Sequence, residues 1–435
     1  MEAEFLFKSQ FDRSMKLLVG GIIFAFSIQP LFNASVPRAL VNPPDPWVYN
    51  IPKNVVSFIH FSNKSMNLKR LYFQPDLIRF YGYPLEEHQV ETEDGYILTL
   101  HRIPYHTRYE IVLFTFEWFS FQLFCYRESS IYAHKYPVLL GHCLTGSSAL
   151  WSYGPEDNSL SYRLAQEGYD VWMFNMRGNH YSRQHKSLNP DLDEEFWSFT
   201  FDESARLDYP AVIDYILNVT SHSKLQYVGY SMGSTQYPIL LSEVPEYNEK
   251  ISAGHLLGPP VFFGDRSEYF LNGYPEVVKK IYGLMAEWAP WKEAFSRQYV
   301  EYMYAGCTMS EMSLQMCLDS WSLFGVAKRD PQLEFLHLLN QPGGSSVKTI
   351  LHYIQLIYGD GKFRKFDHGT EVNLLKYGSE IPPTYDLQNI TAPTKIYAGL
   401  GDNYAHIKDV QKVKSLFKYL FLLIITFEMN FKTNI

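Results

Sequence analysis

Short apolar runs alternate with longer amphipathic stretches through the central part of the chain. Four of these runs are rich in β-branched and aromatic residues and are bounded by Gly, Pro or Asn, which predicts buried strands at Tyr136–Gly141, Tyr169–Asn175, Leu225–Gly229 and Thr394–Gly401. Intervening stretches such as Asp208–Leu217 and Ser234–Ser242 have helical spacing. Because parallel strands need crossover connections, this alternation predicts an α/β fold with a mostly parallel central sheet.

The pattern changes in the second half of the chain. From Pro259 to Phe366 the residue pattern favours helices, is rich in Tyr, Trp, Phe and Met, and shows no clear strands. After this segment the strand–helix alternation resumes. A helical, aromatic insertion at this place predicts a cap over one edge of the sheet. We therefore expect a first core part at 34–258, a helical cap at 259–370 and a second core part at 371–435.

Two segments do not fit this plan. Tyr109–Tyr126 carries eight aromatic residues among 18 and has neither a two-residue nor a 3.6-residue period, and its two glutamates argue against a membrane span. The tail from Leu416 to Phe431 is also strongly apolar and has no turn signals. We expect an atypical insert at 107–134 and an atypical tail at 414–435, both foreign to the fold, such as translated non-coding sequence or an alternative terminus.

The composition of the 435-residue chain excludes two broad classes of protein. With 46% hydrophobic and 19% charged residues, the chain has ample material for a large core and is not a disordered protein. Its formal net charge of −8 and the lack of a basic run argue against binding to nucleic acid. The aromatic fraction of 17% is high and favours a wide apolar groove, an anomalous segment, or both.

The amino terminus has the features of a targeting segment. Lys16 precedes an apolar run, Leu17–Ile28, whose length suits a signal peptide better than a spanning helix. We expect a signal peptide at 1–33, with Met15 as an alternative start, and a secreted product; an uncleaved anchor is the alternative. Triplets of the form N-x-S/T, compatible with glycosylation but close to chance in number, begin at Asn33, Asn63, Asn218 and Asn389.

The four cysteines are too few for a disulfide scaffold. Cys307 and Cys317 lie ten residues apart, a spacing that suits a small disulfide-closed loop as well as it suits two buried thiols. If they are bridged, the constraint on the unfolded chain stabilises the fold by about 2–3 kcal/mol.

The sequence from Gly229 to Gly233 follows a predicted strand, begins a predicted helix and matches the G-x-S-x-G pattern of a serine nucleophile. Glycine at both ends permits a sharp turn that lifts the Ser231 hydroxyl above the sheet. The helix dipole and the Met232 N–H are then placed to stabilise negative charge on an attacked carbonyl oxygen. The alternative is a serine in an ordinary turn between a strand and a helix.

Partners for this serine are predicted at the ends of two other strands. The loop after the strand at 136–141 offers the Leu144 N–H as a second oxyanion donor, whereas His142 is expected to support that loop. Asp402 follows the strand at 394–401 and fits the acid in a chain order of Ser, acid, His. Its alternative role is to cap the end of the strand.

Longer motifs around these residues resemble the acid lipase family, which includes lysosomal, gastric and insect lipases. The similarity spans most of Gln74–Val413, and its longest motifs are Asp76–Pro104, GYDVWMFNMRGNHYSR at Gly168–Arg183, and Asp193–Leu217. Shorter matches approach the acid at Ser345–Gln355, Asp367–Gly369 and Tyr377–Leu387.

The resemblance implies an α/β-hydrolase fold with a helical cap. It implies hydrolysis of carboxylic esters of neutral lipids, such as triacylglycerols or sterol esters, at a lipid–water interface. Ser231 is then the nucleophile, Asp402 the acid, and the Leu144 and Met232 N–H groups form the oxyanion hole. No metal or organic cofactor is implied, the location is secreted or lysosomal, and the oligomeric state is open.

Three features depart from the family pattern. The family has His-Gly where this chain has His142-Cys143, and the insert at 107–134 separates segments that the family joins almost directly. The family also places its catalytic histidine well beyond the acid. The only histidine after Asp402 in this chain is His406, which is four residues on and poorly placed to reach the serine.

The remaining candidates for a base precede the acid and would break the chain order: His255, His337, His352 and His368. We expect a structural role for His368. The first hypothesis is therefore a serine lipase whose chain lacks its general base. A non-catalytic lipid carrier on the same fold, and an esterase for short soluble esters, are the alternatives.

Overall fold

The computed structural model describes residues 74–115, 122–132, 135–154, 156, 159–264, 292–307, 312–313, 341–400, 402 and 404–425. The expected signal peptide at 1–33 lies outside the described residues. Asn63, Cys317 and His337 also lie outside them, as does Asn33 within the signal peptide. In the parts of the chain that are described, no helix is long and apolar enough to cross a membrane.

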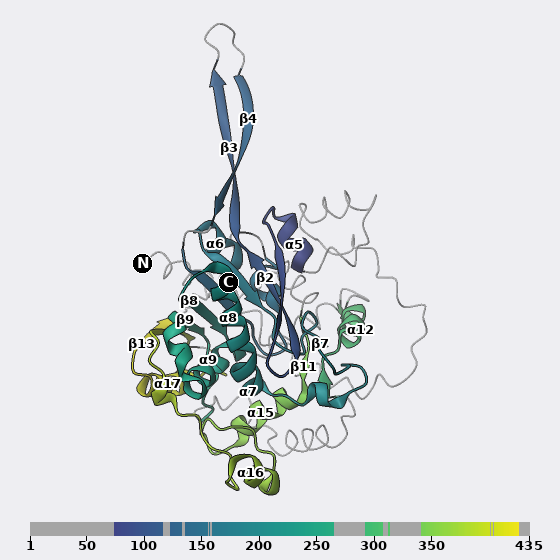
Figure 1. Ribbon diagram of the computed structural model, residues 1–435, viewed down its shortest axis with the longest axis vertical. Coiled ribbons are helices and arrows are strands. Elements are labelled where there is room, and N and C mark those ends of the chain that lie inside the picture. The colour runs from purple at the N-terminus through teal and green to yellow at the C-terminus, as the bar shows by residue number, and fades with distance from the viewer. Residues whose placement is uncertain are drawn as a thin grey trace, which may run out of the picture.

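A central sheet organises the fold (Figure 1). Its strands follow the order β1-β2-β6-β5-β8-β9-β12-β13, with the short β7 paired to β2. Their bounds are β1 Glu86–Glu91, β2 Tyr96–Ile103, β5 Pro137–Gly141, β6 Asp170–Phe174, β7 Gln184–His185, β8 Leu225–Tyr230, β9 Ile251–Leu257, β12 Thr394–Gly399 and β13 Leu420–Ile425. From β6 to β13 every neighbouring pair is parallel, whereas the pairs formed by β1, β2 and β7 are antiparallel.

The four strands predicted from the sequence correspond to β5, β6, β8 and β12, and their mostly parallel order confirms the predicted fold class. The tail, expected to be foreign to the fold, instead enters the sheet. β13 pairs in parallel with β12 from Leu420 to Ile425. An unbroken apolar run is typical of a parallel strand, but no Gly, Pro or Asn signal bounds this run in the sequence, which is why no strand was predicted there.

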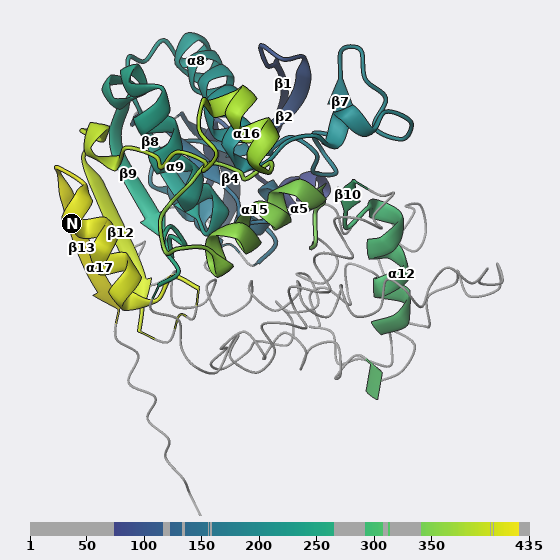
Figure 2. The ribbon, with the colours of Figure 1, turned by 90° about the horizontal axis from the view of Figure 1, so that it is seen from below.

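Helices flank the sheet, and β13 and α17 lie together at one end of the molecule in Figure 2, with α12 at the other. The helices are α5 Gln74–Phe80, α6 Leu160–Gln166, α7 Phe201–Glu203, α8 Tyr209–Thr220, α9 Met232–Glu243, α12 Arg297–Cys307, α15 Val347–Tyr358, α16 Thr370–Tyr377 and α17 Ile407–Leu416. A π-helical turn, Ser204–Asp208, joins α7 to α8. The predicted helices at 208–217 and 234–242 correspond to α8 and α9.

Alternating residues of the sheet pack into two different cores. Leu139, Trp172 and Tyr227 belong to a cluster that includes residues of α8, α9 and α15. Val138 and Val171 belong to a second cluster with residues of α5 and α6. Both faces of the parallel sheet are therefore buried, and each fully buried aliphatic side chain contributes about 1.5–3 kcal/mol. This packing makes the carboxyl ends of the strands a rigid platform.

Between β2 and β5 the chain forms a hairpin. β3 (Tyr105–Thr115) pairs antiparallel with β4 (Gln122–Tyr132) along its whole length, as a separate two-stranded sheet. The hairpin projects away from the body of the molecule (Figure 1). The sequence did not predict strands here because apolar residues occupy successive positions, which removes the two-residue alternation of a half-buried strand.

Within the segment predicted as a cap, 259–370, the structure describes residues 259–264, 292–307, 312–313 and 341–370. β10 (Glu293–Ala294) pairs antiparallel with β11 (Ser345–Ser346), although the sequence showed no strand in this region, because two-residue strands carry no periodic signal. Cys307, at the end of α12, is disulfide-bonded, so a free thiol is excluded for this residue. Its pairing with Cys317 stays a prediction.

Candidate active site

Ser231 lies in the turn between β8 and α9, at the carboxyl end of a central strand. Its backbone has a φ of 51° and a ψ of −110°. A positive φ is rare for a residue with a Cβ and costs about 1–3 kcal/mol. The Ser231 N–H donates to the Leu257 carbonyl at 2.9 Å, and the Ser231 carbonyl accepts from the Thr235 N–H at 3.0 Å. The sheet and α9 thus hold this serine in the sharp turn that its motif predicts.

The two glycines of the motif are required by close packing. A Cβ on Gly229 would lie 2.6 Å from the carbonyl carbon of Gly233, and a Cβ on Gly233 would collide with the carbonyl oxygen of Gly141. The first turn of α9 therefore lies directly against β8 and β5. The Tyr227 hydroxyl donates to the Gly233 carbonyl at 2.6 Å and fastens this contact.

The loop after β5 lies beside the turn between β8 and α9 that carries Ser231, which we call the elbow. The Gly233 N–H donates to the His142 carbonyl at 3.0 Å, which ties the first turn of α9 to the start of this loop. Leu144 follows in the loop, and Met232 is the first residue of α9, where an N–H has no partner within the helix. No acceptor among the described residues takes a hydrogen bond from either N–H. The structure thus brings the two predicted oxyanion donors to adjacent segments at the positive end of a helix.

His142 is buried and uses both ring nitrogens within the fold. Its Nδ1–H donates to the Cys143 carbonyl at 2.8 Å, and its Nε2 accepts from the Met176 N–H at 3.1 Å. Burial lowers the pKa of His142 to about 4, so the ring is neutral at physiological pH. These contacts agree with a supporting role for His142. Cys143 is also buried, so its side chain is accommodated in the core.

Asp402 lies after β12, at the same edge of the sheet as Ser231. Since β9 alone separates β8 from β12, the two strand ends are about 10 Å apart at the usual strand spacing. The Oδ1 atom of Asp402 accepts from the Tyr404 and Ala405 N–H groups, both at 2.9 Å. Burial raises the pKa of Asp402 above its ordinary value, while these hydrogen bonds and the charge of His406 oppose the shift.

The general base is the component that the described residues do not bring to Ser231. His406 directly precedes α17, and in the described parts of the chain no hydrogen bond joins it to Asp402 or to Ser231. Its Nδ1 is buried and has no hydrogen-bond partner among the described residues. The predicted nucleophile, acid and oxyanion donors therefore share one edge of the sheet, and among the described residues no histidine is hydrogen-bonded to Ser231.

The earlier histidines have structural partners. His255, on β9, lies with its Nδ1 3.1 Å from a tyrosine hydroxyl of β12. His352, on α15, donates from Nε2 to the Arg364 carbonyl at 3.0 Å. Burial lowers the pKa of both rings to about 4. His368 lies 3.3 Å from the Lys376 ammonium, remote in sequence from the elbow.

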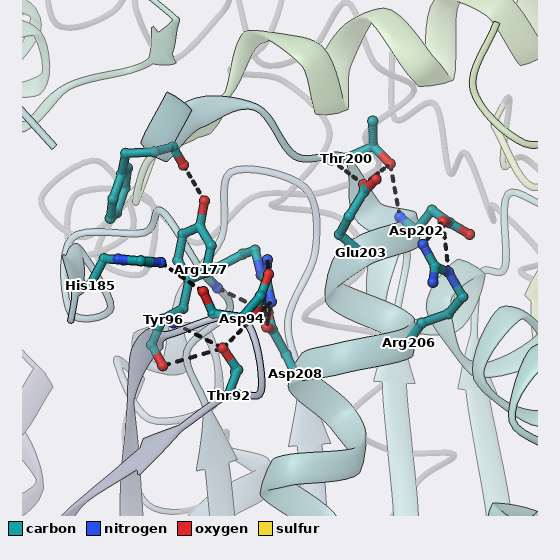
Figure 3. Close-up of polar contacts among 11 residues, drawn as sticks. Thr92, Asp94, Tyr96, Arg177, His185, Thr200, Asp202, Glu203, Arg206 and Asp208 are labelled. Carbon is teal, nitrogen blue, oxygen red and sulfur yellow. Dashed lines mark hydrogen bonds and ion pairs between the residues drawn. The ribbon is translucent and has the colours of Figure 1, made fainter. Parts of the chain in front are cut away.

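A buried ion network supports the same edge of the sheet, and sequence reasoning missed it (Figure 3). Arg177, three residues after β6, donates from Nε to Asp208 at 2.7 Å and from Nη1 to Asp94 at 2.6 Å. Its guanidinium also lies 4.0 Å from the centre of the Tyr96 ring. Burial acts to raise the pKa of Asp94, but the hydrogen bonds and charge of Arg177 outweigh it and lower that pKa. The one available signal was the place of Arg177 in the motif at Gly168–Arg183.

A capping box fixes the helix that carries Asp208 (Figure 3). The Thr200 hydroxyl accepts from the Asp202 N–H at 3.0 Å, and the Glu203 carboxylate accepts from the Thr200 N–H at 2.7 Å. Arg206 donates to Asp202 at 2.8 Å one turn later. Because α7, the π-helical turn and α8 are continuous, this start sets the position of Asp208 and hence of its ion pair with the loop after β6.

Comparisons with known proteins agree with this geometry. Residues 74–154 match the family described as a partial alpha/beta-hydrolase lipase region, and residues 136–288 match the alpha/beta hydrolase fold. Lipase 3 of Drosophila melanogaster is 37% identical over 77% of this chain and 80% of its own length. Human lysosomal acid lipase/cholesteryl ester hydrolase is 34% identical over 77% and 79% of the two chains, and mouse lipase member N is 32% identical over 82% and 84%. The chain therefore belongs to the acid lipase family of α/β-hydrolases.

Proposed function

We propose that this protein is a lipase that hydrolyses carboxylic esters of neutral lipids through an acyl-enzyme on Ser231. The observation that carries the proposal is the strained turn at Ser231, held at the amino end of α9 beside the loop that contains Leu144. A positive φ at a serine is a strained conformation, and such strain clusters at functional sites; Thr145, in the loop beside Ser231, has a similar φ of 55°. The family membership of the chain supports the same reaction.

The proposed reaction has two steps. The Ser231 Oγ attacks the ester carbonyl while a base from solution, such as imidazole, takes its proton, and the Leu144 and Met232 N–H groups stabilise the negative oxygen of the tetrahedral intermediate. The carbon–oxygen bond to the alcohol then breaks as the protonated base returns the proton to the leaving oxygen, which leaves an acyl-enzyme. Water, deprotonated by the same base, attacks the acyl-enzyme, and the proton returns to the Ser231 Oγ as the fatty acid leaves. Asp402 is proposed as the acid that orients a histidine base in this family.

The sequence limits how fast this chain can react. Residues 403–435 contain one histidine, His406, so we infer that these residues do not supply the base that the family places well after its acid. Loss of a triad member lowers the rate on the order of 10⁴-fold, and the residual catalysis comes from the oxyanion hole and substrate binding. We therefore expect slow hydrolysis, which a small base added in solution accelerates.

The proposed substrates are triacylglycerols or sterol esters at a lipid–water interface. A relative is named cholesteryl ester hydrolase, and each acyl CH₂ buried in an apolar cap contributes about 0.8 kcal/mol to binding. A secreted or lysosomal location goes with this proposal. Asn218 and Asn389 are exposed, as glycosylation at these two triplets requires.

Active-site labelling tests the proposed nucleophile. We expect a fluorophosphonate probe to label the folded chain slowly, imidazole to accelerate the labelling, and Ser231→Ala to abolish it. Ser415→Ala, on the exposed side of α17, is the matched control and keeps full labelling. Equal labelling of the Ser231→Ala and wild-type chains would overturn the assignment. Faster cleavage of emulsified long-chain esters than of soluble short-chain esters separates a lipase from an esterase.

The second candidate is a non-catalytic lipid carrier on the same fold. The absence of a histidine after His406 favours it. A carrier binds a fluorescent sterol ester or triacylglycerol with a defined stoichiometry, yet Ser231 stays unlabelled even with imidazole present. Labelling that depends on Ser231 contradicts this alternative.

A further inference from the structure

The segment Gln341–Gly344 directly precedes β11 and passes between two loops of the carboxyl edge. The Gly343 N–H donates to the Thr145 carbonyl at 2.5 Å, and the Gly343 carbonyl accepts from the His180 N–H at 2.7 Å. Thr145 lies in the loop after β5, next to Leu144, and His180 lies in the loop after β6. The backbone of Gly343 therefore joins both loops.

Thr145 is held in an unusual backbone conformation. Its φ is 55°, in the left-handed region, which a β-branched residue rarely adopts. The turn around it is closed by the Gly146 N–H, which donates to the Cys143 carbonyl at 2.9 Å. The hydrogen bond from the Gly343 N–H stabilises the same turn from outside it. A strained backbone of this kind persists only where contacts with the surrounding structure fix it in place.

The close approach of Gly343 requires glycine. A Cβ on this residue would lie 2.7 Å from the Gly146 carbonyl oxygen and 3.1 Å from the Ser147 Cβ. A Cβ on Gly344 would instead approach the other loop, 3.0 Å from His180 Cδ2 and 3.1 Å from the Gly178 oxygen. The two glycines thus face different loops, so substitutions at the two positions separate their effects.

The same segment is fastened to the base of the cap. β11 follows it directly and pairs with β10, and the Val347 N–H donates to the Lys292 carbonyl at 2.8 Å. His180 also lies with its Nε2 3.1 Å from the Phe295 carbonyl, just after β10. Hydrogen bonds therefore connect β10 and β11 through Gly343 to Thr145, the residue after Leu144.

We propose that Gly343 is a positioning residue for the oxyanion loop and that it couples the base of the cap to the Leu144 N–H. The proposal rests on the proposed function, because Leu144 is an oxyanion donor only in an ester hydrolase. It adds a regulatory link to that site. The arrangement of the cap sets whether the second oxyanion donor is in place.

Gly343→Ala tests the link, with Gly344→Ala and Gly306→Ala as matched variants. A Cβ on Gly306, in α12, meets no atom of the described residues within 4 Å, and we expect this control to leave the rate unchanged. Turnover of p-nitrophenyl butyrate in imidazole buffer is measured beside amide hydrogen exchange of the peptide around 143–147. For Gly343→Ala we expect kcat to fall about tenfold or more with KM unchanged, since removing one oxyanion donor costs about 10²–10³. Exchange in the loop accelerates. In Gly344→Ala the new Cβ approaches the other loop and lies at a φ of 93°, which alanine rarely adopts, so this variant should lose at least as much stability but less kcat.

The outcomes separate this inference from the proposed function. Equal kcat and equal loop exchange in Gly343→Ala and Gly306→Ala overturn the positioning role, while activity lost only in Ser231→Ala still supports the lipase. If the wild-type chain is no faster than Ser231→Ala, the proposed function fails; faster loop exchange in Gly343→Ala then still supports the coupling. If kcat falls in both Gly343→Ala and Gly344→Ala only in proportion to the folded protein that each variant loses, the inference is contradicted.

Discussion

The carboxyl edge of the central sheet and the β3–β4 hairpin are both built from strands, yet they are stabilised differently. At the carboxyl edge, segments far apart in the sequence meet, as where Gly233 lies against Gly141 and Arg177 joins Asp94 to Asp208. The hairpin forms a sheet of its own and projects from the body (Figure 1). A substitution at the edge should therefore affect several segments, whereas a change along the hairpin should stay local.

The largest effect is expected from Arg177→Met. This change leaves the Asp208 carboxylate buried without its cation, and breaking a buried ion pair on one side typically costs about 3–5 kcal/mol. Urea denaturation followed by tryptophan fluorescence measures the loss. The control is Lys186→Met, which removes an exposed ion pair with Glu91 and should cost less than about 1 kcal/mol. Equal midpoints for the two variants would show that the buried network contributes little.

A smaller loss is expected from Gly233→Ala. The added Cβ collides with the Gly141 carbonyl, and overpacking of a tight contact typically costs about 1–3 kcal/mol. Because the clash is at the elbow, labelling of Ser231 should fall further than stability does. Gly306→Ala, whose Cβ meets open space, is the control. Unchanged labelling in a folded Gly233→Ala protein would contradict the close contact between α9 and β5.

A shortened hairpin should change stability by less than about 1 kcal/mol, because an isolated two-stranded ribbon is only marginally stable. Arg108 and Ser129 are paired, so replacing residues 109–128 with Asn-Gly closes a shorter hairpin. Thermal unfolding and fluorophosphonate labelling of the shortened chain should match those of the full chain. A loss of several kcal/mol would mean that the hairpin belongs to the cooperative fold, and the contrast between the two regions would not hold.

The smallest effect concerns Asp402 and pH. Burial raises its folded-state pKa above the ordinary value of 3.8, so the unfolded chain releases this proton first as pH rises. Wild-type stability should therefore fall as pH increases from about 3.8 through the folded-state pKa. Asp402→Asn keeps an acceptor for the Tyr404 and Ala405 N–H groups but does not ionise, so its stability relative to wild type should rise across this interval. Parallel pH profiles for the two proteins would refute the raised pKa.

Patterns of apolar residues and turn residues predicted the strands and helices whose apolar positions are the buried ones. The strand before Ser231 is a short apolar run, and the glycines on either side of the serine are needed for a backbone contact that the motif anticipates. The hairpin strands were missed because their apolar residues do not alternate, and β13 because no turn residues bound its apolar run. β10 and β11 were missed because two residues show no period. Periodicity therefore does not predict elements that have an unusual pattern or only a few residues.

By itself, the sequence determined the parallel α/β order, the place of Ser231 at the start of a helix and the position of Asp402 after a strand. These features depend on residues that are neighbours in the chain. Only the tertiary structure decided that Arg177 joins Asp94 to Asp208 and that Gly343 holds the turn at Thr145. Such contacts join segments that are far apart in the chain, and their energy depends on desolvation and close approach, which arise only when those segments pack together.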